Sequence, residues 1–529
     1  MLTGLSLLGA KKGAPAGAAF HGVNPTTGQS LNPAFYSAST DDVNHAVSLA
    51  EEAFTQYRST SGKDRGHFLR TIADSIQAIT EQLVKRANLE TALPEPRLQG
   101  EVVRTANQLR LFAEIIEEGS WTSPRIDTAL PDRKPLPRPD IRSMLLPLGP
   151  VAVFGASNFP LAFSVAGGDT ASALAAGNPV VVKAHPAHPG TSELVGGAIR
   201  ESVQACGLHP GLFSLLFDSG VETGKQLVQH PLIKAVGFTG SLSAGKALMQ
   251  LAANRPEPIP CYAEMSSANP VFILPGALKQ YEKVAADLTA SYTLGAGQFC
   301  TKPGLVLVPE SPDAASLVNE LRSRAAATGE FSMLTKGIAE HYRTGLSHRI
   351  ASKGVSVIHQ GENASGGEAA TATALLETKA EDLLRDPSLA EEVFGPTSLV
   401  VTCKSEEQML QAARSLHGHL TATLLGTEED LASHHELIAI LERKVGRLIF
   451  NGYPTGVEVC HAMVHGGPYP ATSDSRTTSV GSMAIFRFAR PVCYQNLPQS
   501  ALPPELRNEN PLGIMRMVNG ELTQDAVQA

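Results

Sequence analysis

Between residues 147 and 262 the sequence alternates short, continuously apolar runs with longer helical segments, and this alternation constrains the fold most. Four strands are predicted at 149–154, 179–183, 213–217 and 232–238, with helices at 164–176, 192–206, 223–230 and 244–253. Strands that are apolar along their whole length, separated by helices, indicate a parallel sheet covered by helices on both faces. The expected fold class is therefore α/β, with a doubly wound, Rossmann-like domain.

The same alternation resumes from residue 262 to about 460. Strands are predicted at 271–273, 305–308 and 399–401, and helices at 281–293 and 316–327. Because 529 residues are too many for one ordinary domain, a second α/β domain is the natural interpretation. Residues 40–120, ahead of both, are predicted to be helical.

Two further segments differ from this pattern. Residues 122–140 contain five prolines, which interrupt any helix and indicate a linker or an arm. Residues 482–488 predict a late strand, and an extended, proline-containing tail follows it. A late strand and an extended tail need a partner surface, so we expect a homodimer or homotetramer.

Charge, cysteines and apolar runs exclude several classes of protein. The net charge of −8 offers no basic stripe for phosphates, which argues against nucleic acid binding. The six cysteines are scattered without a CxxC pair, which suits a reducing compartment and argues against a zinc site. The apolar run at 2–8 precedes its lysines, the reverse of a secretory signal, and no run approaches the roughly 18–20 apolar residues of a membrane span. We expect a cytoplasmic protein without a membrane partner.

The candidate nucleophile is Cys300, at the predicted end of a helix, in the run Gly295-Ala296-Gly297-Gln298-Phe299-Cys300-Thr301. A lone cysteine is more often a small buried apolar residue than a nucleophile. The glycines, however, indicate open backbone near the sulfur, as a reacting substrate requires, and the thiolate is the reactive form. Both interpretations stay open on these residues alone.

Two polar residues beside predicted strands are candidates for catalysis. Glu264 has small and apolar neighbours that favour a raised pKa and a role as a base, and the alternative is a solvated turn residue. Asn158, next to Ser157, follows strand 149–154, at the end of a parallel strand where ligand sites form. Its amide can donate to a developing oxyanion, or it can serve as a turn or helix cap.

Two other segments suit a phosphorylated, flat ligand. Gly240 and Ser241 join a strand to a helix, where a close approach and the first helix amides can bind a phosphate. The GxGxxG spacing is absent, so a plain glycine-rich connection is the alternative. Glu392 and Phe394 place an acid beside a ring and a tight Gly-Pro turn, which suits ribose hydroxyls and a packed ring, or else a surface turn.

In their order and spacing these segments resemble the aldehyde dehydrogenase superfamily over about residues 20–500. The motifs that carry the resemblance are Asn158-Phe159-Pro160, Lys183, Gly240-Ser241, Glu264, Cys300 and Glu392-Val393-Phe394-Gly395-Pro396. Segments 154–163, 183–191 and 465–472 are similar to the NADP-preferring branch with 2-oxoglutarate semialdehyde (2,5-dioxopentanoate) dehydrogenases. The long-chain fatty-aldehyde dehydrogenase of luminous bacteria is similar in the same segments. One departure is Met265-Ser266-Ser267, where the broad family has Leu-Gly-Gly.

The resemblance implies a role for each candidate. Cys300 attacks the aldehyde carbon, Asn158 and the backbone amide of Cys300 hold the oxyanion, and Glu264 activates the water that hydrolyses the thioester. The implied cofactor-binding residues are Lys183 at the adenine ribose or its 2′-phosphate, Ser241 at the pyrophosphate, Glu392 at the nicotinamide ribose and Phe394 near the ring, together with Gly240 and Ser157. The implied domains are a dinucleotide-binding domain (1–130 and 150–262), a catalytic domain (263–460), and an oligomerisation arm with the C-terminal tail (131–149 and 461–529).

Cofactor choice has a physical basis in the resemblance. NAD-preferring members carry a Glu three residues after the strand-end Lys, and that position here is Pro186. Without that carboxylate nothing there repels a 2′-phosphate, and Lys183 can pair with it. We expect NADP to be preferred and NAD to be accepted.

Several alternatives remain at this point. The substrate can be 2-oxoglutarate semialdehyde or a medium or long aliphatic aldehyde, and a charged anchor in the substrate tunnel favours the first. A CoA-acylating enzyme is disfavoured by Glu264, and a catalytically silent protein on this fold by Cys300 and Glu264. Cys460, His461 and His465 lack a second ligand pair at fitting spacing, so we expect no metal and a structural or substrate-lining role. Arg476 suits either a substrate carboxylate or a structural ion pair.

Overall fold

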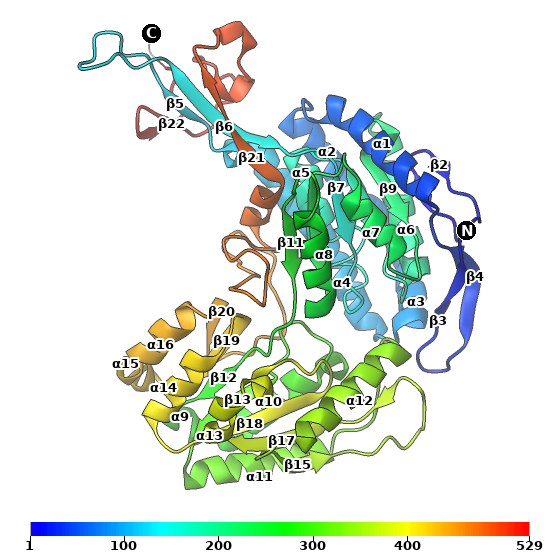
Figure 1. Ribbon diagram of the computed structural model, residues 1–529, viewed down its shortest axis with the longest axis vertical. Helices are drawn as coiled ribbons and strands as arrows, with labels where there is room; N and C mark the ends of the chain where they lie inside the picture. The colour runs from blue at the N-terminus through cyan, green and yellow to red at the C-terminus, as the bar shows by residue number, and fades with distance from the viewer. Residues whose placement is uncertain (1, 528–529) are drawn as a thin grey trace.

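A computed structural model describes residues 2–527 and contains two large parallel sheets and a projecting smaller one (Figure 1). In the first sheet five parallel strands lie in the order β11-β10-β7-β8-β9, with bounds β7 (Val151–Phe154), β8 (Val180–Lys183), β9 (Phe213–Leu216), β10 (Ala235–Thr239) and β11 (Cys261–Glu264). The helices that connect them are α5 (Gly168–Ala176), α6 (Pro189–Ala205), α7 (Glu222–Gln229) and α8 (Leu242–Ala253). The predicted doubly wound sheet is confirmed.

Successive residues of these strands pack on opposite faces of the sheet. Val151 and Val153 join one apolar cluster, whereas Ala152 and Phe154 join another. Burial on both faces explains why the strands are continuously apolar. The apolar N-terminal run adds an antiparallel edge, because β1 (Leu7–Leu8) pairs with β9 and β2 (Lys11–Lys12) pairs with β1.

The predicted helical region at 40–120 forms four helices beside this sheet. They are α1 (Thr40–Tyr57), α2 (Gly62–Ala78), α3 (Thr80–Thr91) and α4 (Glu95–Glu118). The hairpin β3 (Ala19–Val23) and β4 (Ser30–Tyr36) precedes them. Helix α4 packs against α2 and α5, so its buried face lies close to the loop that follows β7.

The second large sheet has the order β15-β17-β18-β13-β12-β19-β20. Its strands are β12 (Val271–Ile273), β13 (Leu305–Pro309), β15 (Ser356–Gln360), β17 (Ala374–Lys379), β18 (Thr397–Cys403), β19 (His419–Leu425) and β20 (Val445–Phe450), and all but β15 are parallel to their neighbours. Flanking helices include α10 (Tyr281–Thr293), α11 (Pro312–Ala326), α12 (Lys336–Ala351), α14 (Glu406–Ser415) and α16 (His435–Glu442). The second α/β unit predicted from the sequence is present.

A five-stranded sheet projects from the body of the molecule (Figure 1). Its order is β21-β6-β5-β22-β23, with bounds β5 (Arg125–Asp127), β6 (Ile141–Pro147), β21 (Ala489–Gln495), β22 (Arg516–Val518) and β23 (Glu521–Thr523). The strand predicted at 482–488 is wrong, because Ser482–Phe488 is a 3-10 helix that precedes β21. Its buried side chains are Ala484, Ile485, Arg487 and Phe488, a spacing near three residues that fits a 3-10 helix.

The domain division stays a prediction, and two features bear on it. Strand β5 lies within the first predicted range but pairs with the arm strand β6. Residues 465–479 lie within the predicted arm and tail but contact Glu264, as described below. Among residues 2–527, no helix combines the length and apolarity needed to cross a bilayer.

Candidate active site

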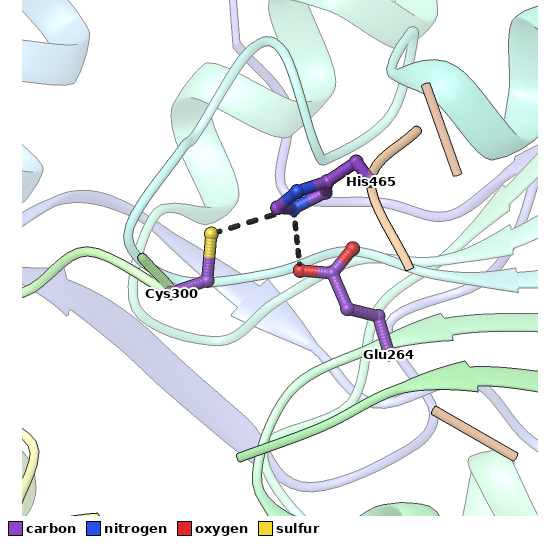
Figure 2. A group of neighbouring side chains, drawn as sticks. All are labelled: Glu264, Cys300 and His465. Carbon is purple, nitrogen blue, oxygen red and sulfur yellow. Dashed lines mark hydrogen bonds and ion pairs between the residues drawn. The ribbon is translucent and has the colours of Figure 1, made fainter. Parts of the chain in front are cut away.

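Glu264, Cys300 and His465 come together although they lie far apart in the sequence (Figure 2). Glu264 ends β11 in the first sheet, and Cys300 lies in the segment between α10 and β13 of the second. His465 lies in the loop between β20 and the 3-10 helix Ser482–Phe488. His465 Nε2 is 2.9 Å from Glu264 Oε1 and 3.5 Å from Cys300 Sγ. The site is therefore assembled from three separate parts of the chain.

The loop before Cys300 has three consecutive residues in the left-handed backbone region. Helix α10 ends at Thr293, so Cys300 follows a 3-10 turn, Leu294–Gly297, rather than lying at the helix end as predicted. Gly295, Ala296 and Gly297 have φ values of 57°, 59° and 65°, in the left-handed region. A Cβ on Gly297 would lie 2.2 Å from the carbonyl oxygen of Gly395. The glycine therefore allows the nucleophile loop to approach the Gly395 turn closely.

Asn269 fixes the far side of this loop, and sequence reasoning missed it. Its Nδ2 donates to the carbonyl oxygens of Cys300 (2.9 Å) and Lys302 (3.0 Å), and its Oδ1 accepts from the hydroxyls of Ser267 and Thr421. Asn269 is fully buried. An asparagine between small residues and a proline is the only local signal, and it does not reveal partners more than thirty residues away.

The carboxylate of Glu264 is held on both oxygens. Oε1 faces His465, and the Ser479 hydroxyl donates to Oε2 at 2.8 Å. Burial alone would raise the pKa of Glu264, but His465, Ser479 and Arg487 outweigh burial and lower it. The raised pKa expected from its small and apolar sequence neighbours is therefore wrong, because these polar partners come from distant parts of the chain. Because the carboxylate is then ionised and accepts, Nε2 of His465 carries the proton of this contact.

The pKa of the Cys300 thiol is shifted in the opposite direction, upward. Burial, the charges of Glu264 and Glu392, and a hydrogen bond to Glu264 raise its pKa well above the ordinary value, and Arg104 opposes this only in part. The resting sulfur is therefore a thiol, with a carboxylate and an imidazole in reach to accept its proton or to donate to the thiolate.

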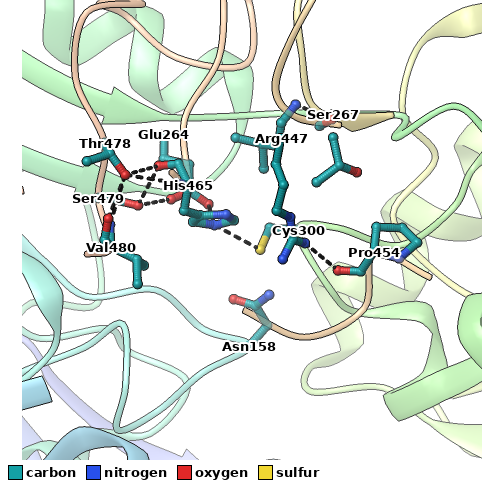
Figure 3. Close-up of polar contacts among 12 residues, drawn as sticks. Asn158, Glu264, Ser267, Cys300, Arg447, Pro454, His465, Thr478, Ser479 and Val480 are labelled. Atoms are coloured by element: carbon teal, nitrogen blue, oxygen red, sulfur yellow. Dashed lines mark hydrogen bonds and ion pairs between the residues drawn. The ribbon is translucent and has the colours of Figure 1, made fainter. Parts of the chain in front are cut away.

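Asn158 faces the same sulfur from the first sheet, as predicted for an oxyanion donor (Figure 3). It is 8% exposed, and its Nδ2 donates to the carbonyl oxygen of Gln298 at 3.1 Å. Arg97 Nη2 donates to the Asn158 carbonyl oxygen at 2.8 Å. Since a side-chain amide carries two N–H donors, one remains for an oxyanion beside Cys300.

A cavity of about 490 Å³ opens onto Cys300. Three phenylalanines and two arginines line this cavity, namely Phe159, Phe163, Phe299, Arg104 and Arg447. Part of the loop that precedes His465 completes the lining. Sequence reasoning missed both arginines, because nothing near them in the sequence indicates a site. The cavity thus combines aromatic walls with positive charge at the nucleophile.

The predicted cofactor-binding residues of the first sheet lie at the carboxyl ends of its parallel strands. Ser157 follows β7, Lys183 ends β8 and Gly240 follows β10, and the parallel register sets Phe154 beside Lys183 and Phe238. The hydroxyl of Ser241 caps α8 by accepting from Ala244 N, and it is exposed. A helix N-terminus beside an exposed hydroxyl and a strand-end lysine fits a phosphorylated cofactor.

Lys183 has an acidic neighbour, Asp218, just after the end of the next strand, β9. Burial lowers the pKa of Lys183, and the charge of Asp218 opposes that shift. The Asp218 carboxylate already accepts from the backbone N–H groups of Gly220 and Thr223 at the start of α7. The Asp218 carboxylate is therefore already engaged by backbone donors.

Glu392 and Phe394 lie on the other sheet, in the loop before β18. Burial raises the pKa of Glu392, and Lys302 together with hydrogen bonds from Ser266 and the Ser267 backbone opposes this. Lys302 is 1% exposed and donates to the carbonyl oxygens of Val393 (3.0 Å) and Thr397 (2.9 Å). Lys302, two residues after the nucleophile, thus ties the Cys300 loop to the Glu392 loop.

Ser266 and Ser267, which stand where the broad family has two glycines, each form a hydrogen bond with another part of the site. Ser267 Oγ donates to Asn269 and accepts from Leu420 N at 2.9 Å, so it belongs to the support of the Cys300 loop. Ser266 contacts Glu392 instead. The serines therefore connect the base-bearing loop to two other parts of the site.

The Glu264, Cys300 and His465 atoms that could bind a metal all lie within 4.8 Å of one another. Carboxylate, thiolate and imidazole are zinc ligands, so the set fits a metal chemically, and the linear spacing gave no sign of it. His461 and Cys460 do not belong to this group of three residues.

Arg476, which suited either a substrate carboxylate or a structural ion pair, forms an exposed ion pair with Asp474 at 2.7 Å.

Comparison with known proteins gives consistent matches. Residues 14–469 match the model of the aldehyde dehydrogenase family. Alpha-ketoglutaric semialdehyde dehydrogenase 2 of Azospirillum brasilense is 50% identical over 98% of this chain and 99% of its own length. The alpha-ketoglutaric semialdehyde dehydrogenase of Acinetobacter baylyi is 47% identical, covering 95% of both chains. A solved NAD-dependent aldehyde dehydrogenase from Sinorhizobium meliloti has a TM-score of 0.79 at 22% identity, over 93% of this chain and 95% of that one.

Proposed function

The chain belongs to the aldehyde dehydrogenase family, whose members use NAD or NADP, and on that premise we propose that it oxidises 2-oxoglutarate semialdehyde to 2-oxoglutarate with NADP as the preferred acceptor. The observation that carries this proposal is a cavity that holds Cys300 and two arginines among aromatic side chains. A substrate with an aldehyde at one end and a carboxylate at the other matches those two features. The names of the two relatives near 50% identity support the same substrate.

We assign the first chemical step to Cys300 and Asn158. The thiol loses its proton to solvent in the cavity, His465 Nε2 donates to the thiolate, and the sulfur attacks the aldehyde carbon to form a thiohemiacetal. The oxyanion accepts from the second N–H of Asn158 and from the backbone N–H of Cys300. A nicotinamide held by Glu392 would supply the hydride acceptor for this carbon, and loss of the hydride would leave a thioester on Cys300.

The second step belongs to Glu264. Its carboxylate removes a proton from a water molecule, the oxygen attacks the thioester carbon, and the C–S bond breaks to release the acid and the thiol. His465 donates through Nε2 to the carboxylate in the resting site and has Cys300 Sγ in reach once that sulfur is ionised. His465 is therefore a shared donor that orients the base and stabilises the sulfur.

The cofactor would lie across the carboxyl ends of the parallel strands of the first sheet. Lys183 would hold the adenine ribose or its 2′-phosphate, Ser241 and the N-terminus of α8 the pyrophosphate, and Glu392 the nicotinamide ribose. Preference for NADP is supported by Pro186 in the place of a ribose-binding carboxylate and by the hydrogen bonds that already occupy Asp218.

Oligomerisation through the projecting arm completes the proposal. The sheet β21-β6-β5-β22-β23 ends in two open strand edges, and Leu136 and Leu522 are 70% and 69% exposed. Open edges and exposed leucines favour pairing with another copy of the chain. Sedimentation equilibrium of the purified protein tests this, and a monomer at micromolar concentration would contradict it.

The test of the activity is the formation of reduced nicotinamide by the purified protein. The assay compares 2-oxoglutarate semialdehyde with hexanal and decanal, with NADP or NAD, beside Cys300→Ala. Preference for the semialdehyde with NADP, lost in the variant, is the expected result. Preference for the aliphatic aldehydes would instead identify a fatty-aldehyde enzyme, and no turnover on any of them would support a catalytically silent protein.

A further inference from the structure

We propose that Arg104 binds the terminal carboxylate of the substrate and so selects short aldehydes that carry one. Arg104 lies on α4 and lines the same cavity as Cys300. The inference deepens the proposed function and rests on it, because it names the group that would recognise an acidic aldehyde.

The guanidinium of Arg104 is held in place, but its terminal nitrogens have no hydrogen-bond partner among residues 2–527. Its Nε donates to the carbonyl oxygen of Val457 at 3.3 Å, and its central carbon lies 5.0 Å from the centre of the Phe163 ring. Nη1 and Nη2 are both buried, and neither has a hydrogen-bond partner among residues 2–527. A planar fork with two free, adjacent donors matches the two oxygens of a carboxylate.

The acids around Arg104 do not neutralise it by contact. Burial lowers the pKa of Arg104, and the charges of Glu101, Cys300, Glu264 and Glu458 oppose that shift. Glu101 accepts instead from the backbone N–H groups of Leu161 and Ala162. Glu458 is exposed, and neither acid forms an ion pair with Arg104 in the described part of the chain. A buried cation of this kind favours an incoming anion.

The other arginines of the region have structural tasks. Arg447 donates through its terminal nitrogens to the carbonyl oxygens of Pro454 (2.8 Å, Figure 3) and Gly456 (3.0 Å), so both of these nitrogens are engaged, whereas Nε has no partner among residues 2–527. Arg97 donates to the Asn158 carbonyl oxygen and lies over the rings of Phe159 and Phe299. Arg104 is thus the cavity arginine whose two terminal nitrogens remain available together.

The walls of the cavity define the rest of the substrate class. Phe159 packs edge to face against Phe163 and Phe299, and all three rings line the cavity together with Cys300 and Arg104. Aromatic sides suit a short carbon chain, while Cys300 takes the aldehyde carbon and Arg104 the carboxylate. The proposed class is therefore short ω-oxo acids, of which 2-oxoglutarate semialdehyde is one.

The test measures kcat and KM for 2-oxoglutarate semialdehyde and for pentanal, an uncharged aldehyde of the same carbon number. The variants are Arg104→Met, which keeps length without charge, and Arg104→Lys, which keeps charge without the fork. Arg110→Met is the matched control, because it removes an arginine from the same helix at an exposed ion pair with Asp74. Circular dichroism and thermal unfolding report whether each variant is folded.

Because Arg104 also lowers the pKa of Cys300, its loss affects both aldehydes, and the ratio of their kcat/KM values carries the test. We expect Arg104→Met to lower kcat/KM for the semialdehyde about 100-fold more than kcat/KM for pentanal, mainly through KM for the semialdehyde. Arg104→Lys should recover part of the loss, and Arg110→Met should match wild type. An equal loss on both aldehydes, or no loss on the semialdehyde, would overturn the role of Arg104. The wild-type preference between the two aldehydes tests the proposed function separately, since it does not depend on any variant.

Discussion

The imidazole of His465 lies 2.9 Å from the carboxylate of Glu264, and the same nitrogen is 3.5 Å from the sulfur of Cys300. Base and nucleophile are therefore connected through one buried N–H group. His465 is 1% exposed and Glu264 4%, so solvent does not compete strongly for either contact. Removing the imidazole would leave the carboxylate without its neighbour and the thiolate without a donor.

His465→Phe is expected to lower kcat about 100-fold, the range associated with a lost acid–base partner. Steady-state rates with saturating semialdehyde and NADP measure this. His461→Phe is the control, because His461 lies in the same loop but is exposed. A variant that keeps the wild-type kcat would show that Glu264 and Cys300 act without His465.

Glu264→Gln should separate the two halves of the reaction. The amide keeps the shape of the side chain but cannot remove a proton from water, so the thioester should accumulate on Cys300. Rapid mixing should show a burst of reduced cofactor near one equivalent per active site, followed by a slow steady state. A linear trace without a burst would contradict this assignment.

The raised pKa of Cys300 predicts how alkylation depends on pH. Because the thiolate reacts and the thiol predominates below its pKa, the rate with iodoacetamide should rise about tenfold per pH unit through neutral pH. The partner Glu264 has a lowered pKa and stays ionised across this range, so it does not mask the trend. Mass spectrometry of Cys300 against exposed Cys493 measures it, and a pH-independent rate would contradict a raised pKa.

The lowered pKa of Glu264 also predicts how the stability of the protein changes with pH. A carboxyl with a lower pKa in the folded state stabilises the protein above its unfolded-state pKa and loses that effect as pH falls through the folded-state pKa. The difference in unfolding free energy between wild type and Glu264→Gln should therefore be constant near neutral pH and shrink only in acid. Urea titrations across that range measure it, and a difference that already shrinks near neutral pH would contradict the shift.

Asn269→Ala should cost about 3 kcal/mol of unfolding free energy, because it leaves the buried carbonyl oxygens of Cys300 and Lys302 without their donor. The kcat should fall as well, since the nucleophile loop loses its anchor. Urea denaturation and steady-state assays measure both effects. Asn363→Ala, at an exposed asparagine with one hydrogen bond, should change neither.

Cofactor preference should follow the charge at the end of β8. Lys183→Gln should raise KM for NADP about tenfold and affect NAD less, because it removes a cation near the proposed 2′-phosphate site. Pro186→Glu should act in the same direction by adding a carboxylate. The ratio of kcat/KM for the two cofactors measures this, and an unchanged ratio in both variants would place the phosphate elsewhere.

The sequence by itself determined the α/β fold and the identity of the chemical groups. Continuously apolar strands separated by helices require burial on both faces, and the two clusters on β7 confirm that requirement. Cys300, Glu264 and Asn158 could be proposed from short motifs, because loops at the ends of parallel strands collect functional side chains. At 482–488, by contrast, the local pattern was misinterpreted, since burial against α5 and not alternation decides the 3-10 helix.

Only the tertiary structure decided how the site is completed. Asn269 and Arg104 have no local signature, and the 465–472 motif did not show what His465 contacts. Their partners, Cys300, Val457 and Glu264 respectively, lie 31, 353 and 201 residues away along the chain. Hydrogen bonds and ion contacts depend on distance in space, and one sequence does not give that distance. The nucleophile and its base were therefore predictable from the sequence, whereas the donor they share and the cation opposite them required the folded chain.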